Sequence, residues 1–170
     1  DYKSSVCDVK LQDQLVVFGA VVIEGAKWCC KTDTARQAAA SALFMQDRDN
    51  SANYKQIAAT KPSLLLEGET PRLIDEWAEA PVLWDAVRYA VDMRGDVGQF
   101  ILTGSAVPKD VTDDENLKEE EKRMHSGVGR IAPMRMRTMS LWESKESNGK
   151  VSLASLFEGD ADVAAISDLT

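Results

Sequence analysis

Short apolar runs recur along the chain, and each is bounded by glycine, proline or polar residues. AVVIE at 20–24, RLIDEW at 72–77 and QFILTGS at 99–105 have the length of strands, and the first is apolar on both faces. Such runs are typical of strands buried in a parallel sheet. ALFMQD at 42–47 predicts another strand. IAPMRMRTMSLWE at 131–143 alternates methionine with arginine, and we expect a further strand there, at an edge of the sheet.

Four other segments have the composition or spacing of helices. Residues 6–18 carry apolar side chains at helical spacing, and 33–43 is rich in alanine, so a helix is expected to begin near Thr32. Pro62 suits a helix start, and that helix should end by Gly68. A longer helix follows Pro81, and Gly95 and Gly98 end it. The apolar positions of the first and last helices are Val6, Val9, Leu11, Leu15 and Phe18, and Val82, Trp84, Val87, Val91 and Met93.

Strands and helices therefore alternate along the chain. This order favours an α/β fold in three layers, with a mostly parallel sheet and helices on both faces. We expect one domain over residues 1–170, with its core at about 10–143. The charge-dense segment 109–125 is expected to be an exposed loop or a solvated helix.

Composition narrows the possible functions. The formal net charge of −8 argues against a general affinity for nucleic acids or anionic membranes, and no apolar run reaches the length of a membrane span. Cys7, Cys29 and Cys30 do not form a secreted disulfide framework, so a reducing cytosol is the simpler interpretation. The single histidine, His125, makes a zinc site improbable and receives no role.

The segment EGAKWCCKTDTA, residues 24–35, has most features of a phosphate-binding loop. Gly25, Lys31 and Thr32 stand at the spacing at which glycine opens such a loop, lysine reaches the outer phosphates and threonine binds Mg²⁺. A buried strand precedes the segment and a helix follows it, as that site requires. Cys30 replaces the usual second glycine. The residues expected to surround phosphate are Gly25, Ala26, Lys27, Trp28, Cys29, Cys30, Lys31, Thr32 and Asp33.

Acidic and hydroxyl side chains follow two other strands. Asp75, after the strand RLID, would hold Mg²⁺ together with Thr32, and Glu76 would polarise the attacking water. Thr103 or Ser105 would contact the γ-phosphate or the water. Each motif taken alone also fits an ordinary turn or a solvated strand end. Their occurrence in this order, each at the carboxyl end of a strand, favours a nucleotide site.

The motifs together resemble a known family. VVIEGAKWCCKTDTARQ, LLLEGETPRLIDEWAEAPVLWDAVRYAVD, GQFILTGSA and HSGVGRIAPMRMRTMSLWES are similar to AAA-type ATP-binding proteins of bacteria and archaea whose AAA domain precedes a C-terminal domain of unknown function. The resemblance covers about residues 10–158 and only the nucleotide-binding part of that family. It implies a P-loop NTPase fold, ATP and Mg²⁺ as ligands, and a cytoplasmic location. It also implies that Arg130 senses phosphate within the chain or reaches a neighbouring subunit.

Two departures from the family keep alternatives open. Cys30 stands in place of glycine, and no segment is recognised as the helical lid or the following domain. If the loop needs a positive φ at Cys30, its Cβ costs about 1–2 kcal/mol and weakens binding about tenfold. The leading hypothesis is a Mg²⁺-dependent ATPase domain, which would self-associate or bind a partner protein. The alternatives are a scaffold with little turnover and, less favoured, a small-molecule kinase.

The remaining candidates are tryptophans and basic residues. Trp28 could stack on a base, but we expect it to pack beside the loop. Trp77, Trp84 and Trp142 are expected in the core or an interface. Arg123, Arg135 and Arg137 are expected on a solvated or ion-paired face.

Overall fold

The computed structural model describes residues 2–104, 127, 129–148, 154 and 157–159. Its elements, in chain order, are α1 (Val6–Leu15), β1 (Ala20–Glu24), α2 (Lys31–Ala38), β2 (Ser41–Phe44), α3 (Ser51–Thr60), the 3₁₀ helix η1 (Pro62–Leu66), β3 (Arg72–Asp75), the 3₁₀ helix η2 (Trp77–Glu79), α4 (Val82–Arg94), β4 (Phe100–Gly104) and β5 (Ile131–Arg135).

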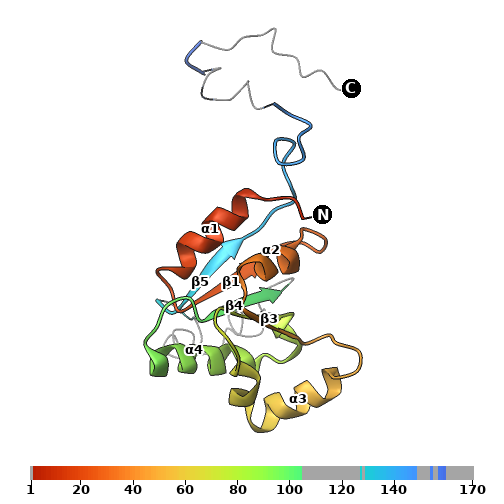
Figure 1. Ribbon diagram of the computed structural model, residues 1–170, viewed down its shortest axis with the longest axis vertical. Coiled ribbons are helices and arrows are strands. Elements are labelled where there is room, and N and C mark those ends of the chain that lie inside the picture. Colours follow the sequence, from red (N-terminus) through yellow and green to blue (C-terminus); the bar gives the residue numbers. More distant parts are fainter. Residues whose placement is uncertain (1, 105–126, 128, 149–153, 155–156, 160–170) are drawn as a thin grey trace, which may run out of the picture. The chain divides into compact units, whose positions relative to one another are not determined.

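The five strands form one parallel sheet in the order β2-β3-β4-β1-β5 (Figure 1). The predicted α/β class with a parallel sheet is therefore confirmed. β5 is an edge strand, as predicted, although it ends at Arg135 rather than continuing to 143. Because all strands point the same way, their carboxyl ends lie along one edge of the sheet.

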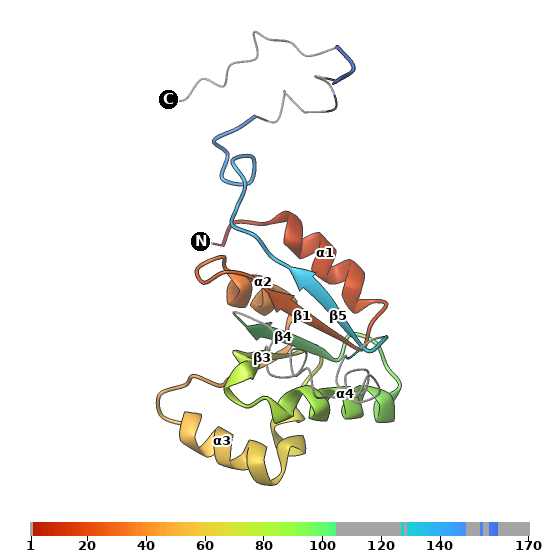
Figure 2. The same ribbon diagram turned by 180° about the vertical axis from the view of Figure 1, so that it is seen from behind.

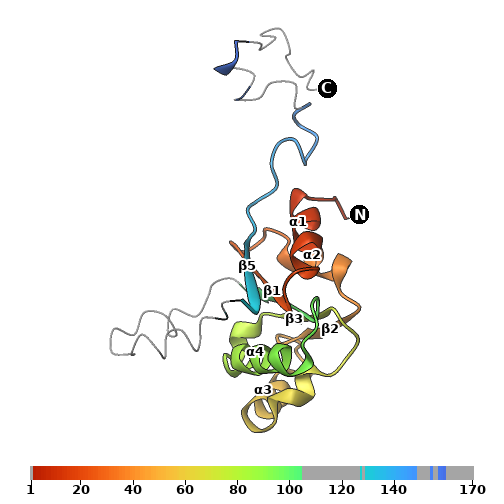
Figure 3. The same cartoon turned by 90° about the vertical axis from the view of Figure 1, so that its left-hand side faces the viewer.

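Both faces of the sheet are covered, and each has its own core. On one face α1 and α2 pack on β1, β4 and β5, with Leu11, Leu15, Val21, Ile23 and Ile101 buried. On the other face α3, η1, η2 and α4 cover the sheet (Figures 1 and 3). Figure 2 shows the same layers from behind. Alternate residues of one strand serve the two cores, which explains why consecutive residues of β1, β3 and β4 are apolar and buried.

Several helices differ from the sequence prediction. In α1 only Leu11 and Leu15 are fully buried, whereas Val6 and Val9 are exposed. The helix predicted over 33–43 ends at Ala38, because the chain must turn there to enter β2. The helix α3 was not predicted, since the polar stretch before it favoured a loop. The segment after Pro62 is a single 3₁₀ helix.

The chain divides into two compact units rather than the single domain expected over 1–170. Cys7–Thr138 forms the unit with the sheet, and Asp1–Val6 forms the other with Met139–Thr170. Within the second unit the Glu143 carboxylate accepts hydrogen bonds from Ser5 Oγ (2.7 Å) and from the backbone N–H of Val6 (2.8 Å) and Ser140 (2.8 Å). These bonds, with one from the Ser140 hydroxyl, lower the pKa of Glu143 to about 2. The predicted acidic segment 109–125 lies outside the described residues.

Candidate functional site

The loop between β1 and α2 has an unusual backbone. Cys30, the residue that precedes α2, has φ 62° and ψ 27°, in the left-handed region, and its side chain makes no capping hydrogen bond. Trp28 also has a positive φ, 68°. Left-handed residues within a turn direct successive N–H groups into a concavity that suits anions. The loop therefore has the backbone character of a phosphate-binding loop, at a helix start where the dipole also favours negative charge.

Gly25 lets this loop approach the segment that follows β5. A Cβ at Gly25 would lie 2.3 Å from the carbonyl oxygen of Met136 and 2.9 Å from Cys29 Sγ. The Met136 N–H donates to the Glu24 carbonyl at 2.7 Å, and the buried Cys29 thiol donates weakly to the Met136 carbonyl at 3.9 Å. The opening glycine is thus needed for close packing, and the loop base is fixed to β5.

Lys31 is buried, with 6% of its surface exposed. Its ammonium group donates to the carbonyl oxygens of Gly25 (3.0 Å) and Ala26 (2.8 Å), and Cys29 Sγ lies 4.0 Å away. In this structure the lysine therefore ties the two ends of the loop together. An ammonium group carries three N–H donors, and the two carbonyls accept two of them.

Hydroxyl and acidic groups from helix α2 and from strands β3 and β4 meet beside the loop. Thr32 Oγ1 donates to Asp75 Oδ1 at 2.7 Å, and Thr103 Oγ1 donates to the same oxygen at 2.5 Å. Thr103 is fully buried and lies between Ile23 and Asp75 in the register of the sheet. The structure thus brings Thr32, Asp75 and Thr103 to one point, at the carboxyl edge of the sheet.

Glu76 lies next to this cluster, and its carboxyl group is partly buried close to other acidic side chains. Its backbone is left-handed, with φ 52°, and its N–H donates to Thr103 Oγ1 at 3.3 Å. Burial raises the pKa of Glu76, and the nearby charges of Asp75 and Glu79 raise it further, while Lys31 and Lys27 act in the opposite direction. A carboxyl group with a raised pKa accepts a proton more readily near neutral pH, as a general base must.

A cavity of about 660 Å³ opens over these groups. Its volume lies within the range typical of small-ligand sites. The residues that line it are Lys27, Trp28, Cys30, Lys31, Thr32, Asp33, Gln46, Asp75, Glu76 and Glu79. Of the predicted loop residues, Gly25, Ala26 and Cys29 do not line it.

Gln46 and Glu79 are site residues that the sequence analysis missed. Gln46 Nε2 donates to Glu79 Oε1 at 3.0 Å, and Lys55 pairs with Glu79 Oε2 at 2.6 Å. Gln46 stands two residues after β2, but the strand predicted over 42–47 included it, so it was not recognised as a residue that follows a strand. Nothing in the sequence indicated that β2 lies on the side of β3 that faces this cavity.

Trp28 does not pack beside the loop as expected. Its side chain is 96% exposed, although it lines the cavity. Trp77 is buried, and its ring centroid lies 5.0 Å from that of Trp84, so these two do belong to the core. Trp142 is 59% exposed.

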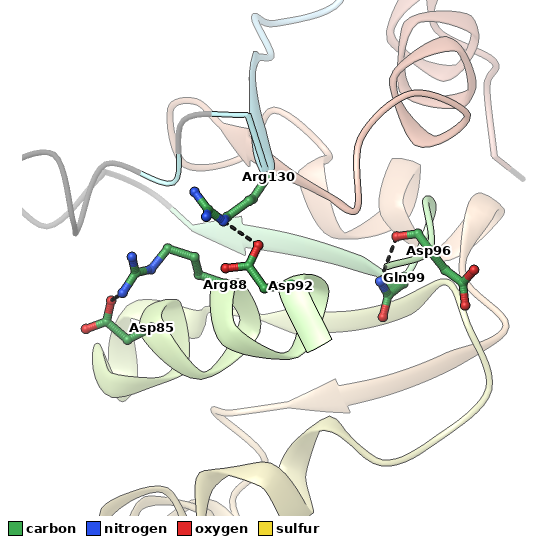
Figure 4. Close-up of polar contacts among 6 residues, drawn as sticks. All are labelled: Asp85, Arg88, Asp92, Asp96, Gln99 and Arg130. Carbon is green, nitrogen blue, oxygen red and sulfur yellow. Dashed lines mark hydrogen bonds and ion pairs between the residues drawn. The ribbon is translucent and has the colours of Figure 1, made fainter. Parts of the chain in front are cut away.

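The structure does not bring Arg130 to the cavity. This residue precedes β5, and its carbonyl oxygen accepts a hydrogen bond from the N–H of Ala20, the first residue of β1. It therefore lies at the amino edge of the sheet, opposite the loop. Its guanidinium pairs with Asp92 near the end of α4, at 2.5 Å (Figure 4). Ser105, the other expected sensor, lies outside the described residues.

The donors present fit Mg²⁺ better than a metal that needs a full protein cage. Among the described residues no three His, Cys, Asp or Glu side chains are grouped as a metal site. Mg²⁺ is commonly held by one or two protein oxygens together with phosphate and water. Thr32 Oγ1 and Asp75 Oδ1 are two such oxygens on one side of the cavity.

No protein-family model matches the sequence, and no curated protein matches it significantly. The fold and the site define the chain as an α/β protein with an open parallel sheet and a polar cavity at its carboxyl edge. The resemblance to AAA-type proteins rests on the motifs alone and stays a prediction. Within the described part of the chain, no helix is both long and apolar enough to span a bilayer.

Proposed function

We propose that this chain is an AAA-type, P-loop nucleotide-binding domain that binds ATP with Mg²⁺ and hydrolyses it. The observation that carries the proposal is the 2.7 Å hydrogen bond between Thr32 and Asp75 at the mouth of a cavity of about 660 Å³. Residues 43 positions apart supply the hydroxyl and the carboxylate that a shared Mg²⁺ requires. No disulfide bond joins Cys7, Cys29 and Cys30, which suits a cytoplasmic location.

Each side chain at the cavity has a role in this proposal. Thr32 and Asp75 would hold Mg²⁺, which when bound neutralises charge on the phosphates. Lys31 fixes the loop through two carbonyls, and its positive charge would attract the phosphates. Glu76 accepts a proton from water as the water oxygen attacks the γ-phosphorus and the bond to the β-phosphate oxygen breaks. Thr103 holds Asp75 and the Glu76 backbone in register.

A second candidate is a nucleotide-binding scaffold with little turnover. Cys30 favours it, because a residue with a Cβ occupies a left-handed position that glycine adopts without strain. Self-association or binding to a partner protein would then be the main task of the domain. Both candidates predict nucleotide binding, and they differ in hydrolysis.

Binding is tested by titrating Mg·ATP and following thermal unfolding. A ligand that binds only the folded protein stabilises it by about 2.7 kcal/mol at one hundred times its Kd. We expect a rise in Tm that depends on concentration and on Mg²⁺, and none in the Asp75→Ala and Lys31→Ala variants. Absence of any rise in the wild-type chain at millimolar Mg·ATP would reject the proposal.

Turnover is tested by single-turnover hydrolysis of radiolabelled ATP. Glu76→Gln should keep the thermal shift and lose hydrolysis by at least about a hundredfold, as expected for removal of a general base. Arg130→Ala is the matched control, since Arg130 lies at the opposite edge of the sheet, where its guanidinium pairs with Asp92. It should leave ATP affinity unchanged. Hydrolysis that is absent in the wild type, with binding intact, would select the scaffold.

A further inference from the structure

Trp28 is the most exposed large apolar side chain of the described residues, at 96%. An indole ring in water is costly, because its large apolar surface gains most from burial. The left-handed backbone at Trp28, with φ 68°, is itself uncommon for a residue with a side chain. The Trp28 ring therefore lies outside the core and lines the same cavity as Thr32 and Asp75.

The neighbouring side chains indicate which part of a ligand Trp28 would meet. Lys27 lines the same cavity as Glu76, and its positive charge lowers the pKa of Glu76. Lys31, Thr32 and Asp75 are charged or hydroxyl groups suited to phosphates and Mg²⁺. Trp28 is the only aromatic side chain among the lining residues of the described cavity, so it is the one surface there that suits a flat, apolar ring.

We propose that Trp28 is the base-binding residue of the site and stacks on the nucleobase of the bound nucleotide. This inference rests on the proposed function. Stacking on an aromatic ring tolerates every base, because each base has a π-face. Among the other lining residues, Gln46 already donates through Nε2 to Glu79, and the stack itself does not discriminate between base edges. The site should accept purine nucleotides in general, with ATP and GTP bound about equally.

The decisive experiment compares ligands with and without a base. Calorimetric titration with Mg·ATP, Mg·GTP and Mg·tripolyphosphate is carried out on the wild type, Trp28→Ala and Trp28→Phe. Loss of a base–aromatic stack lowers affinity about tenfold or more. We expect Trp28→Ala to lose this factor for ATP and GTP and to bind tripolyphosphate as the wild type does, and Trp28→Phe to recover most of the loss.

Tyr89→Ala is the matched control, because Tyr89 is an exposed aromatic residue of α4, at 64%, that does not line this cavity. It should leave all three affinities unchanged. If Trp28→Ala weakens tripolyphosphate as much as ATP, Trp28 only supports the loop and the stacking proposal is overturned. Equal affinities of wild type and Trp28→Ala for ATP also overturn it. If neither ATP nor tripolyphosphate binds the wild type, the proposed function itself fails.

Discussion

At the scale of single residues, the loop between β1 and α2 differs from the sequence prediction more in its backbone conformation than in the side chains that it brings to the site. The sequence showed that Cys30 occupies a glycine position, and the strain at this residue could be anticipated only conditionally. The structure places Cys30 at φ 62°. The same conformation at Trp28 was not anticipated, because no residue type marks it. Substitutions at Cys30 and Trp28 therefore distinguish whether backbone strain or side-chain chemistry limits the affinity for ATP.

Replacing Cys30 by glycine should relieve the left-handed strain. We expect the free energy of unfolding to rise by about 1 kcal/mol and Mg·ATP to bind up to about tenfold more tightly. Denaturant unfolding and ATP titration measure the two effects. Cys30→Ala is the matched control, since it removes the thiol but keeps the Cβ, and it should show neither gain. An equal gain in Cys30→Ala would mean that the sulfur, not the backbone, is responsible.

Glu76 makes stability depend on pH. Because its folded-state pKa is raised above 4.5, the folded protein holds this proton more tightly than the unfolded chain. Glu76 therefore lowers the free energy of unfolding as pH rises from about 4.5 through the folded-state pKa. Glu76→Gln removes this loss, so the variant should be increasingly more stable than the wild type as pH approaches neutrality, and equal to it at low pH.

Glu79→Gln should change the pH dependence of the free energy of unfolding in the opposite direction. Hydrogen bonds from Lys55 and Gln46 lower the pKa of Glu79, so its carboxylate stabilises the fold above the ordinary pKa. This variant should lose stability near neutral pH and recover relative to the wild type on acidification. Denaturant unfolding at several pH values checks both. A Glu76→Gln difference that does not change with pH would contradict the raised pKa.

At the scale of elements, hydrophobic pattern predicted the strands better than the helices. β1, β3 and β4 are buried on both faces, so their apolar runs follow directly from their environment. α3 buries only Ala58 fully, with Tyr54 and Ile57 partly buried, and so few apolar positions give almost no periodic signal. The position of Arg130, at the amino end of β5, also could not be predicted from the hydrophobic pattern. Arg130 lies beside a predicted strand, yet only the strand's direction decides which edge of the sheet it occupies.

Two glycines at element ends should respond differently to alanine. Gly25→Ala drives a Cβ to 2.3 Å from a backbone carbonyl, so β5 and the loop must separate. We expect a loss of about 1–3 kcal/mol in stability and loss of Mg·ATP binding. Gly95, which ends α4 at φ 72°, has no atom within 4 Å of an added Cβ. Gly95→Ala should cost about 1–2 kcal/mol from backbone strain alone and keep ATP affinity.

Thermal unfolding and ATP titration distinguish the two glycine variants. Gly25→Ala and Gly95→Ala are distinguished by their ATP affinity, because their expected losses of stability overlap. Retention of ATP binding in Gly25→Ala would show that the contact between the loop and β5 is not needed for the site.

At the scale of the whole molecule, the site depends on the lateral order of the strands. β4 lies between β1 and β3, so Thr103 stands between Ile23 and Asp75 in the sheet, and its hydroxyl group bonds to Asp75 Oδ1. The sequence indicated that these segments end at the same edge, but not which strands are neighbours. For the same reason it could not indicate that Gln46, which follows β2, reaches the cavity. Lateral order comes from long-range packing, which a local pattern does not contain.

Among the strands that the structure describes, β5 has no neighbour on its outer side, and we expect Pro133 to protect this edge. The Arg130 carbonyl and the Met136 N–H bond to β1, at 3.0 and 2.7 Å, so the even-numbered residues of this strand face β1. Pro133, an odd-numbered residue, directs its nitrogen to the open edge, where it offers no N–H to another chain. Pro133→Ala should restore that donor. We expect near-unchanged monomer stability and faster growth of light scattering at high protein concentration.

Pro81→Ala is the control for this prediction. It also exchanges proline for an N–H, but at the start of α4, where no strand edge is open and the first N–H groups of a helix lack partners in any case. Its light scattering should follow the wild type. Because the two substitutions are chemically identical, aggregation that rises in Pro133→Ala alone must come from the strand edge. Equal scattering in both variants, at matched stability, would mean that the chain protects β5 by some means other than this proline.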